Sequence, residues 1–180
     1  MILILGKGTL AQAIHKKTKD SICVGRSEFD FSSKADCDRL IDSFNPSVVI
    51  NTVALNENND IWDILTTNYT SLTYLTFKFY DKMSSGLIVN ISSASTLWVS
   101  YPNISSHRLV YNLSKESVSN FVRHFNRSIV DHDKNVTICV AELGRFPSKF
   151  NNYQTGTDVN VMADHIIDII NNPKQQVTVI

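Results

Sequence analysis

The stretch ILILGKGTLAQAI, residues 2–14, joins a short apolar run to a helix-like segment through two closely spaced glycines. Gly6 permits a tight turn directly after the run, and Gly8 lets a bound pyrophosphate approach the backbone. Ala11 allows a helix to pack closely on a sheet, and the N-terminus of that helix presents free N–H groups to phosphate. The stretch therefore predicts a dinucleotide-binding turn between a strand and a helix. A glycine turn that serves only the fold is the alternative.

Apolar runs and helix-like segments alternate along the rest of the chain. The runs are rich in Val and Ile and mostly continuous, as in buried parallel strands: residues 2–5, 21–24, 47–54, 86–92, 136–143 and 175–180. The helix-like segments lie between them: 9–17, 33–44, 61–83, 111–130 and 158–170. This alternation predicts an α/β fold, a single Rossmann-like, doubly wound parallel sheet of about six strands with helices on both faces.

The expected strand order is 2-1-3-4-5-6, with right-handed crossovers. The segment around Phe29–Phe31 leaves no room for a crossover helix after the second strand, so we expect a loop there. Nothing in the sequence marks a domain boundary. Residues 1–180 are therefore predicted to form a single NAD(P)-binding domain without a separate substrate domain.

The composition is that of an ordinary globular protein, with 180 residues, 43% of them hydrophobic and 19% charged, and a formal net charge of +0. Because no basic run occurs, we expect no binding to nucleic acid or to a membrane surface. Three widely spaced cysteines indicate free thiols in a reducing compartment, so a cytoplasmic location is expected. The five histidines show no ligand spacing, and no metal site is predicted.

The end of the second strand carries Gly25, Arg26 and Ser27, where an NAD-binding protein would place an acidic residue. A guanidinium group at this position suits a 2′-phosphate, which arginine can bind with two hydrogen bonds. NADP is therefore the expected cofactor. Glu28 follows closely, so NAD remains possible.

Tyr111 and Lys115 stand four residues apart and so lie on one face of a predicted helix. They continue the apolar stripe formed by Val118 and Val122, which faces the sheet. A nearby ammonium group and an oxidised nicotinamide would both favour the phenolate form of the tyrosine and lower its pKa. Together with the predicted cofactor turn and Ser93 at the end of a predicted strand, the pair predicts an acid–base centre; the motif in isolation would not. The alternative is an aromatic residue at the edge of the core with a lysine extending past it.

Several motifs, taken in order, resemble the short-chain dehydrogenase/reductase family over most of the chain. They are the glycine turn at residues 6–11, Asp30 after the second strand, NTVA (51–54), TTNYTSLTYLT (66–76), IVNISSAS (88–95), YNLSK (111–115) and VAELGRF (140–146). The compact glycine turn also resembles the family's nucleotide-sugar branch, of the dTDP-4-dehydrorhamnose reductase type.

The resemblance implies a catalytic tetrad and a set of cofactor contacts. The tetrad is Asn68, Ser93, Tyr111 and Lys115, with Ser92 and Ser95 left open as alternatives for the serine. The implied cofactor-binding residues are Gly6, Lys7, Gly8, Thr9, Leu10, Arg26, Ser27, Asp30, Phe31, Asn51, Thr52, Val53, Tyr111, Lys115 and Gly144. The chain departs from the family at Leu143, where a proline is expected, and lacks most of the usual substrate-binding insertion.

The expected function is hydride transfer between NADP and a small carbonyl or alcohol substrate, with Tyr111 as the acid–base group. The alternatives are an NAD(P)-binding sensor or scaffold without turnover and an enzyme that modifies a nucleotide sugar. His107, Arg108 and Arg145 lie near strand ends and could contact an anionic substrate. We also expect a homodimer built on the two long helices, with exposed apolar residues Leu72, Phe79 and Phe121.

Overall fold

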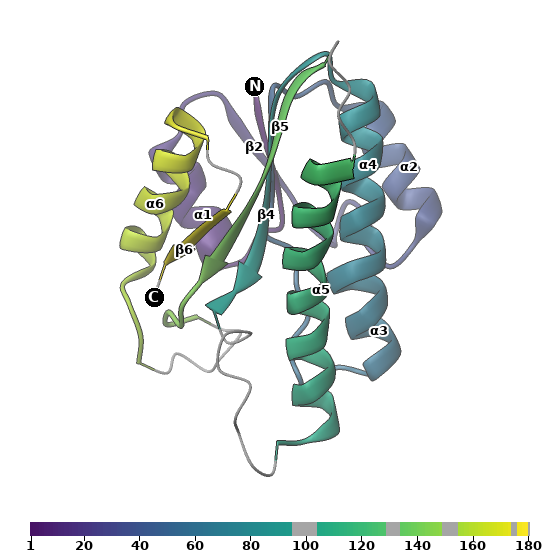
Figure 1. Cartoon of the computed structure of the whole chain (residues 1–180), viewed down its shortest axis with the longest axis vertical. Coiled ribbons are helices and arrows are strands. Elements are labelled where there is room, and N and C mark those ends of the chain that lie inside the picture. The colour runs from purple at the N-terminus through teal and green to yellow at the C-terminus, as the bar shows by residue number, and fades with distance from the viewer. Residues whose placement is uncertain (95–103, 129–133, 149–154, 174–175, 180) are drawn as a thin grey trace.

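The structure, a computed structural model, describes residues 1–94, 104–128, 134–148, 155–173 and 176–179. Six strands form one parallel sheet: β1 (Ile2–Leu5), β2 (Ser21–Val24), β3 (Val48–Asn51), β4 (Ser85–Ser93), β5 (Asn135–Leu143) and β6 (Gln176–Val179). Their spatial order is β2-β1-β3-β4-β5-β6, which confirms the predicted order. Figure 1 shows the sheet lying between two groups of helices. The predicted loop at Phe29–Phe31 is also confirmed, since no strand lies between β2 and the next helix.

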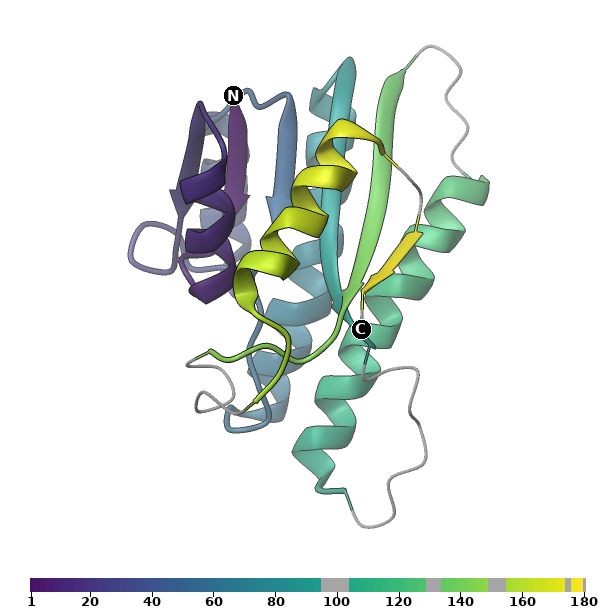
Figure 2. The same ribbon diagram turned by 90° about the vertical axis from the view of Figure 1, so that its left-hand side faces the viewer.

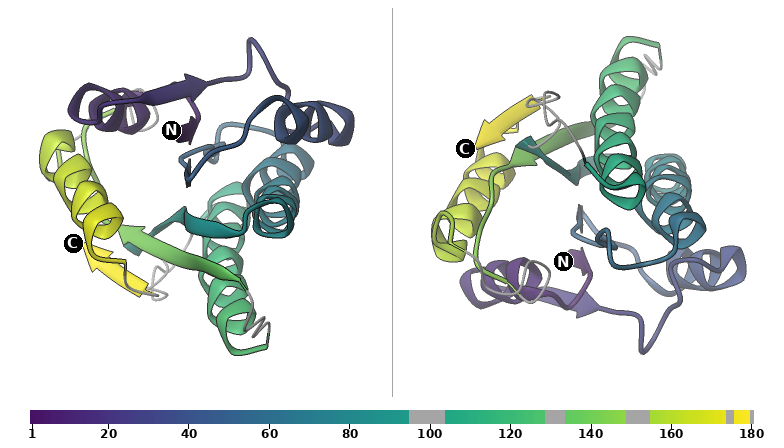
Figure 3. Two further views of the ribbon diagram at one scale, coloured as in Figure 1. Left: turned by 90° about the horizontal axis from the view of Figure 1, so that it is seen from above. Right: turned by 90° about the horizontal axis from the view of Figure 1, so that it is seen from below.

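Helices cover both faces of the sheet, as predicted (Figure 3). The helical elements are α1 (Thr9–Lys17), α2 (Lys34–Ser43), α3 (Ile61–Leu65), the π-helical turn η1 (Thr66–Ser71), α4 (Leu72–Lys82), α5 (Ser106–Ser128) and α6 (Val159–Asn171). Apolar residues of α1 and α6 pack on one face. Residues of α2, α4 and α5 pack on the other face. Figure 2 shows α6 in front of the sheet and β6 beside β5.

Several boundaries differ from the sequence expectation, and helix α5 begins at Ser106 rather than at residue 111. Strand β3 ends at Asn51 rather than at residue 54, because the Asn51 side chain accepts a hydrogen bond from the Val53 N–H (3.3 Å) and the chain turns away. The predicted helix 61–83 is divided by the π-helical turn. Helix α2 begins as predicted, with the Ser33 hydroxyl accepting a hydrogen bond from the Asp36 N–H (3.3 Å).

The prediction that Leu72 and Phe79 are exposed is wrong. They are 1% and 0% exposed, because they lie on the face of α4 that packs into the core. Phe121 is half-buried and packs edge-on against Phe77, with ring centroids 5.3 Å apart. On α3, η1, α4 and α5, the exposed large apolar residues are Trp62, Leu65, Tyr69, Phe77, Leu109 and Leu113. Among the described helices, none is long and apolar enough to cross a membrane.

Candidate active site at the carboxyl edge of the sheet

The glycine turn between β1 and α1 has the geometry that its sequence predicts. Gly6 has φ +116°, and a Cβ atom there would lie 2.4 Å from Thr52 Oγ1. That hydroxyl is fixed, because it donates a hydrogen bond to the Leu5 carbonyl (2.7 Å). Gly8 precedes the first turn of α1, and a Cβ there would meet nothing within 4 Å. The backbone at the start of α1 is therefore open to a ligand, and Thr9 and Leu10, two of the predicted cofactor-binding residues, form that first turn.

An anion already occupies the donors at the end of β2, and it is the carboxylate of Glu28. This carboxylate accepts hydrogen bonds from the Gly25 N–H (3.0 Å) and the Ser27 hydroxyl (2.7 Å) and forms an ion pair with Lys7. The hydrogen bond from Lys7 is the largest cause that lowers the pKa of Glu28 to about 2. Arg26 is exposed beside this cluster. Two predicted cofactor residues, Lys7 and Ser27, thus bind Glu28 in the free protein.

Asp30 and Phe31 follow in the loop that leads to α2. The Asp30 carboxylate accepts hydrogen bonds from the backbone N–H (2.9 Å) and the hydroxyl (2.7 Å) of Ser32, and these bonds lower its pKa. Phe31 is 2% exposed and its ring lies in the core. If Phe31 contacts a cofactor, it can do so only through its backbone.

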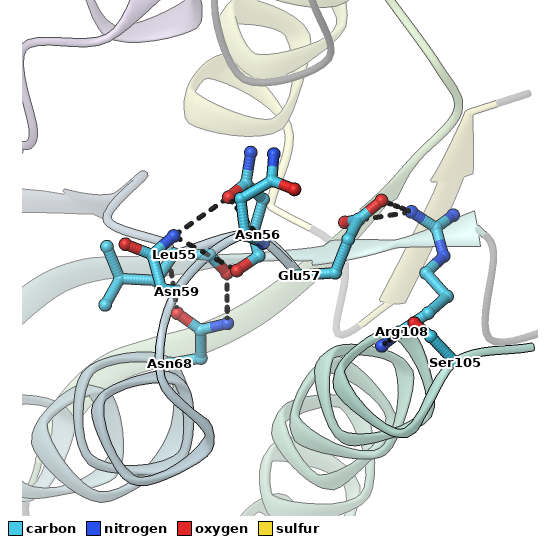
Figure 4. Close-up of polar contacts among 8 residues, drawn as sticks. Leu55, Asn56, Glu57, Asn59, Asn68, Ser105 and Arg108 are labelled. Atoms are coloured by element: carbon cyan, nitrogen blue, oxygen red, sulfur yellow. Dashed lines mark hydrogen bonds and ion pairs between the residues drawn. The ribbon is translucent and has the colours of Figure 1, made fainter.

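Asn68 lies in the π-helical turn and uses its whole side chain to hold the segment after β3. Its Oδ1 accepts a hydrogen bond from the Leu55 N–H (2.6 Å), and its Nδ2 donates one to the Leu55 carbonyl (2.8 Å) (Figure 4). The same Nδ2 also donates to the Ser114 hydroxyl (3.2 Å). The side chain is fully buried. A π-helical turn is uncommon and often marks a functional position. Here, through the hydrogen bonds of Asn68, the turn links the segment that follows β3 to helix α5.

Ser93 and Tyr111 come together at the end of β4. Tyr111 lies in the second turn of α5, is 7% exposed, and forms a side-chain hydrogen bond with Ser93. Burial raises the pKa of Tyr111 to about 12. The register pairs Ser93 with Leu143, so Gly144 continues from β5 beside the same strand end. Ser93, Tyr111 and Gly144 therefore lie at one edge of the sheet.

Ser92 has a different environment from Ser93. Its hydroxyl donates to the Lys115 carbonyl (2.7 Å) and accepts from the Ser119 hydroxyl (2.9 Å), and the side chain is 4% exposed. Ser92 thus fastens β4 to α5, whereas Ser93 contacts the tyrosine. Ser95, the other alternative, lies outside the described residues.

Lys115 is 3% exposed, one turn after Tyr111 on α5. Its ammonium group donates a hydrogen bond to the Ile91 carbonyl (3.1 Å). Burial lowers its pKa to about 8. An amine with this pKa changes its charge close to neutral pH, as residues of active sites often do.

An ion pair that the sequence did not predict lies beside Tyr111. The Arg108 guanidinium contacts both carboxylate oxygens of Glu57 (3.1 and 3.2 Å) (Figure 4). The same guanidinium lies 5.4 Å from the centre of the Tyr111 ring. The sequence signal was Arg108 near a strand end, but its partner lies 51 residues away. Of the three basic residues considered as anion contacts, Arg108 is thus held by a carboxylate of the chain itself.

The chain matches no family model, and no curated protein matches it at a significant level. Solved structures do match. A short-chain dehydrogenase from Burkholderia cenocepacia in complex with NADP has a TM-score of 0.80 at 12% identity, with 98% of this chain and 86% of that chain covered. A 3-alpha-hydroxysteroid dehydrogenase from Pseudomonas sp. complexed with NADH has a TM-score of 0.81 at 13% identity, with 99% and 94% covered. This is the short-chain dehydrogenase fold. At this identity the likeness is one of fold, and it confirms the fold that the motifs implied.

Proposed function

We propose that the protein is an NADP-dependent oxidoreductase that transfers hydride between the nicotinamide and a small carbonyl or alcohol substrate. The observation that carries this proposal is the group of Ser93, Tyr111 and Lys115 on the sheet edge that also holds the glycine turn. The residues present fit a dinucleotide, since Gly8 leaves open space in front of α1. Bound NADP would supply or accept the hydride. NAD remains the alternative cofactor.

In this proposal the residues of the chain hold and move one proton. Tyr111 donates its phenolic proton to the carbonyl oxygen as hydride arrives, and removes it in the reverse direction. Ser93, which already bonds to Tyr111, donates a hydrogen bond to the same oxygen. Lys115 binds the cofactor ribose and, when protonated, favours the phenolate. Asn68 holds the segment after β3 against α5, through its hydrogen bonds to Leu55 and Ser114.

We also propose a single domain over residues 1–180, a cytoplasmic location and a homodimer. The buried cysteines Cys37 and Cys139, which form no disulfide, suit a reducing compartment. The dimer would form on α3–α5, where Trp62 is 74% and Leu113 48% exposed. An apolar surface of this kind favours association with a second copy.

The test combines calorimetry with an activity screen. NADPH and NADH binding would be measured calorimetrically, and consumption of the reduced cofactor would be followed with aldehydes, ketones and nucleotide sugars. The proposal expects NADPH binding and turnover of a simple carbonyl compound, both absent from a protein in which Gly8 is replaced by Asp. Binding without any turnover would favour the sensor or scaffold, and turnover of nucleotide sugars alone would favour that branch of the family.

A further inference from the structure

We infer that the Glu57–Arg108 ion pair adjusts the acidity of Tyr111, with Arg108 as a positioning residue that favours the phenolate and Glu57 as the residue that limits this effect. The inference rests on the proposed function, in which Tyr111 is the acid–base group. Glu57 and Arg108 would thereby set the pH range in which Tyr111 can work.

The geometry places the ion pair directly against the tyrosine. Arg108 precedes Tyr111 by three residues on α5, so both side chains lie on one face of the helix. The guanidinium is 5.4 Å from the ring centre, within the range of a cation–π contact. Such a contact becomes stronger when the ring gains negative charge. Arg108 therefore stabilises the phenolate more than the neutral phenol.

Glu57 is held in place by the short segment that joins β3 to α3. Asn68 binds both backbone groups of Leu55 at the beginning of this segment. The Asn56 Oδ1 accepts hydrogen bonds from the Asn58 N–H (3.2 Å) and the Asn59 Nδ2 (2.8 Å). Glu57 lies in the chain between Asn56 and Asn58, and both of its carboxylate oxygens accept hydrogen bonds from Arg108 (Figure 4). These bonds hold the backbone on either side of Glu57, and the two contacts with Arg108 orient the carboxylate itself.

The charges around Tyr111 act in opposite directions. Burial raises its pKa to about 12, Arg108 and the hydrogen bond from Ser93 of β4 lower that pKa, and Glu57 raises it. Lys115, the next cationic residue on α5, has a pKa of about 8 and loses its charge above that pH. A guanidinium group stays protonated throughout. Arg108 is therefore the cation that still favours the phenolate when Lys115 has become neutral.

The test measures the tyrosine itself, without turnover. A fluorinated tyrosine, whose phenol is more acidic than that of tyrosine, replaces Tyr111, and its titration is followed by ¹⁹F NMR in the free protein. Arg108→Met should raise its pKa by about one pH unit, because the guanidinium lies 5.4 Å from the ring at a partly exposed position, and Glu57→Gln should lower it. Arg108→Lys keeps the positive charge, so the pKa of residue 111 should stay close to its value in the unmodified protein.

Two control variants remove a similar charge elsewhere: Arg127→Met at the exposed end of α5 and Asp42→Asn on α2. Both should leave the titration of residue 111 unchanged. If Glu57→Gln and Arg108→Met also leave it unchanged in folded protein, or shift it in the same direction, the inference is wrong. The proposed function can fail separately, because the opposite shifts would still be measured in a protein that turns over no carbonyl compound.

Discussion

The side chain of Ser93, at the end of β4, is hydrogen-bonded to the side chain of Tyr111, while the neighbouring Ser92 is bonded to the backbone of Lys115. Adjacent serines thus make separate contacts: Ser92 holds α5 on the sheet, and Ser93 is the serine that the proposed function assigns to the reaction.

Ser93→Ala should lower turnover ~10²–10³-fold, the effect of removing one donor to a reacting oxygen. Ser92→Ala should leave the chemistry nearly intact but lower the free energy of unfolding by ~1–3 kcal/mol, because the buried Ser119 hydroxyl loses its acceptor. Turnover and urea unfolding of both variants separate the two effects. Equal losses of turnover would contradict the assignment of Ser93.

Lys115 should make the stability of the free protein depend on pH in the mildly alkaline range. Its pKa of about 8 lies below the ordinary lysine value of 10.5, so the unfolded chain binds the proton more tightly. The resulting destabilisation is complete below pH 8 and disappears as the pH rises toward 10.5. We expect stability to rise with pH in this window, as measured by urea unfolding.

Lys115→Met removes this pH dependence. At pH 7 the variant should be more stable by roughly 2 kcal/mol: ~3 from the lost ionisation, less ~1 for the hydrogen bond to Ile91. It should also bind the cofactor more weakly and turn over more slowly. If the variant is less stable than the unmodified protein at pH 7, burial of the charged Lys115 side chain does not lower the free energy of unfolding, and this prediction is wrong.

The cofactor preference should depend on Arg26 and Glu28 in opposite ways. Arg26→Ala should weaken NADPH binding by ~1.5–3 kcal/mol and leave NADH binding nearly unchanged, because only NADPH carries the 2′-phosphate. Glu28→Gln should strengthen NADPH binding, since Lys7 and Ser27 no longer hold a competing carboxylate. Calorimetry measures both. Equal affinity of the unmodified protein for NADPH and NADH would reject the preference for NADP.

The proposed dimer depends on exposed apolar residues of α3 and α5. Trp62→Glu combined with Leu113→Glu should give a monomer in sedimentation at micromolar concentration. Val161→Glu on α6 changes a residue of similar exposure (44%) on the other side of the sheet and should leave the dimer intact. A monomeric mass for the unmodified protein would contradict the proposal.

The sheet could be predicted from the sequence because its signals are local. Continuous Val and Ile runs identify buried strands, and the turn at Gly6 needs a residue that tolerates positive φ. The buried face of α4 could not be predicted, because LTYLTFKFY is apolar on more than one side. Only packing against the sheet places Phe79 inward and leaves Phe77 at the surface.

The sequence motifs of the candidate site could be recognised, but the contacts between its residues could not be predicted. Tyr111 and Lys115 are recognisable by their spacing on a helix. The bond between Lys7 and Glu28 spans 21 residues and that between Glu57 and Arg108 spans 51, and no local pattern specifies either. The hydrogen bonds between Asn68, in the π-helical turn, and the backbone of Leu55 likewise span 13 residues.

Single-turnover hydride transfer by Tyr111→Phe, with a confirmed carbonyl substrate and saturating NADPH, examines the acid–base role without the complication of product release. The substitution removes one oxygen and keeps the ring, so folding and cofactor binding should survive. The transfer rate should fall ~10²–10⁴-fold, the share that general acid–base catalysis usually supplies. A folded Tyr111→Phe protein that transfers hydride at the unmodified rate would contradict the role proposed for Tyr111.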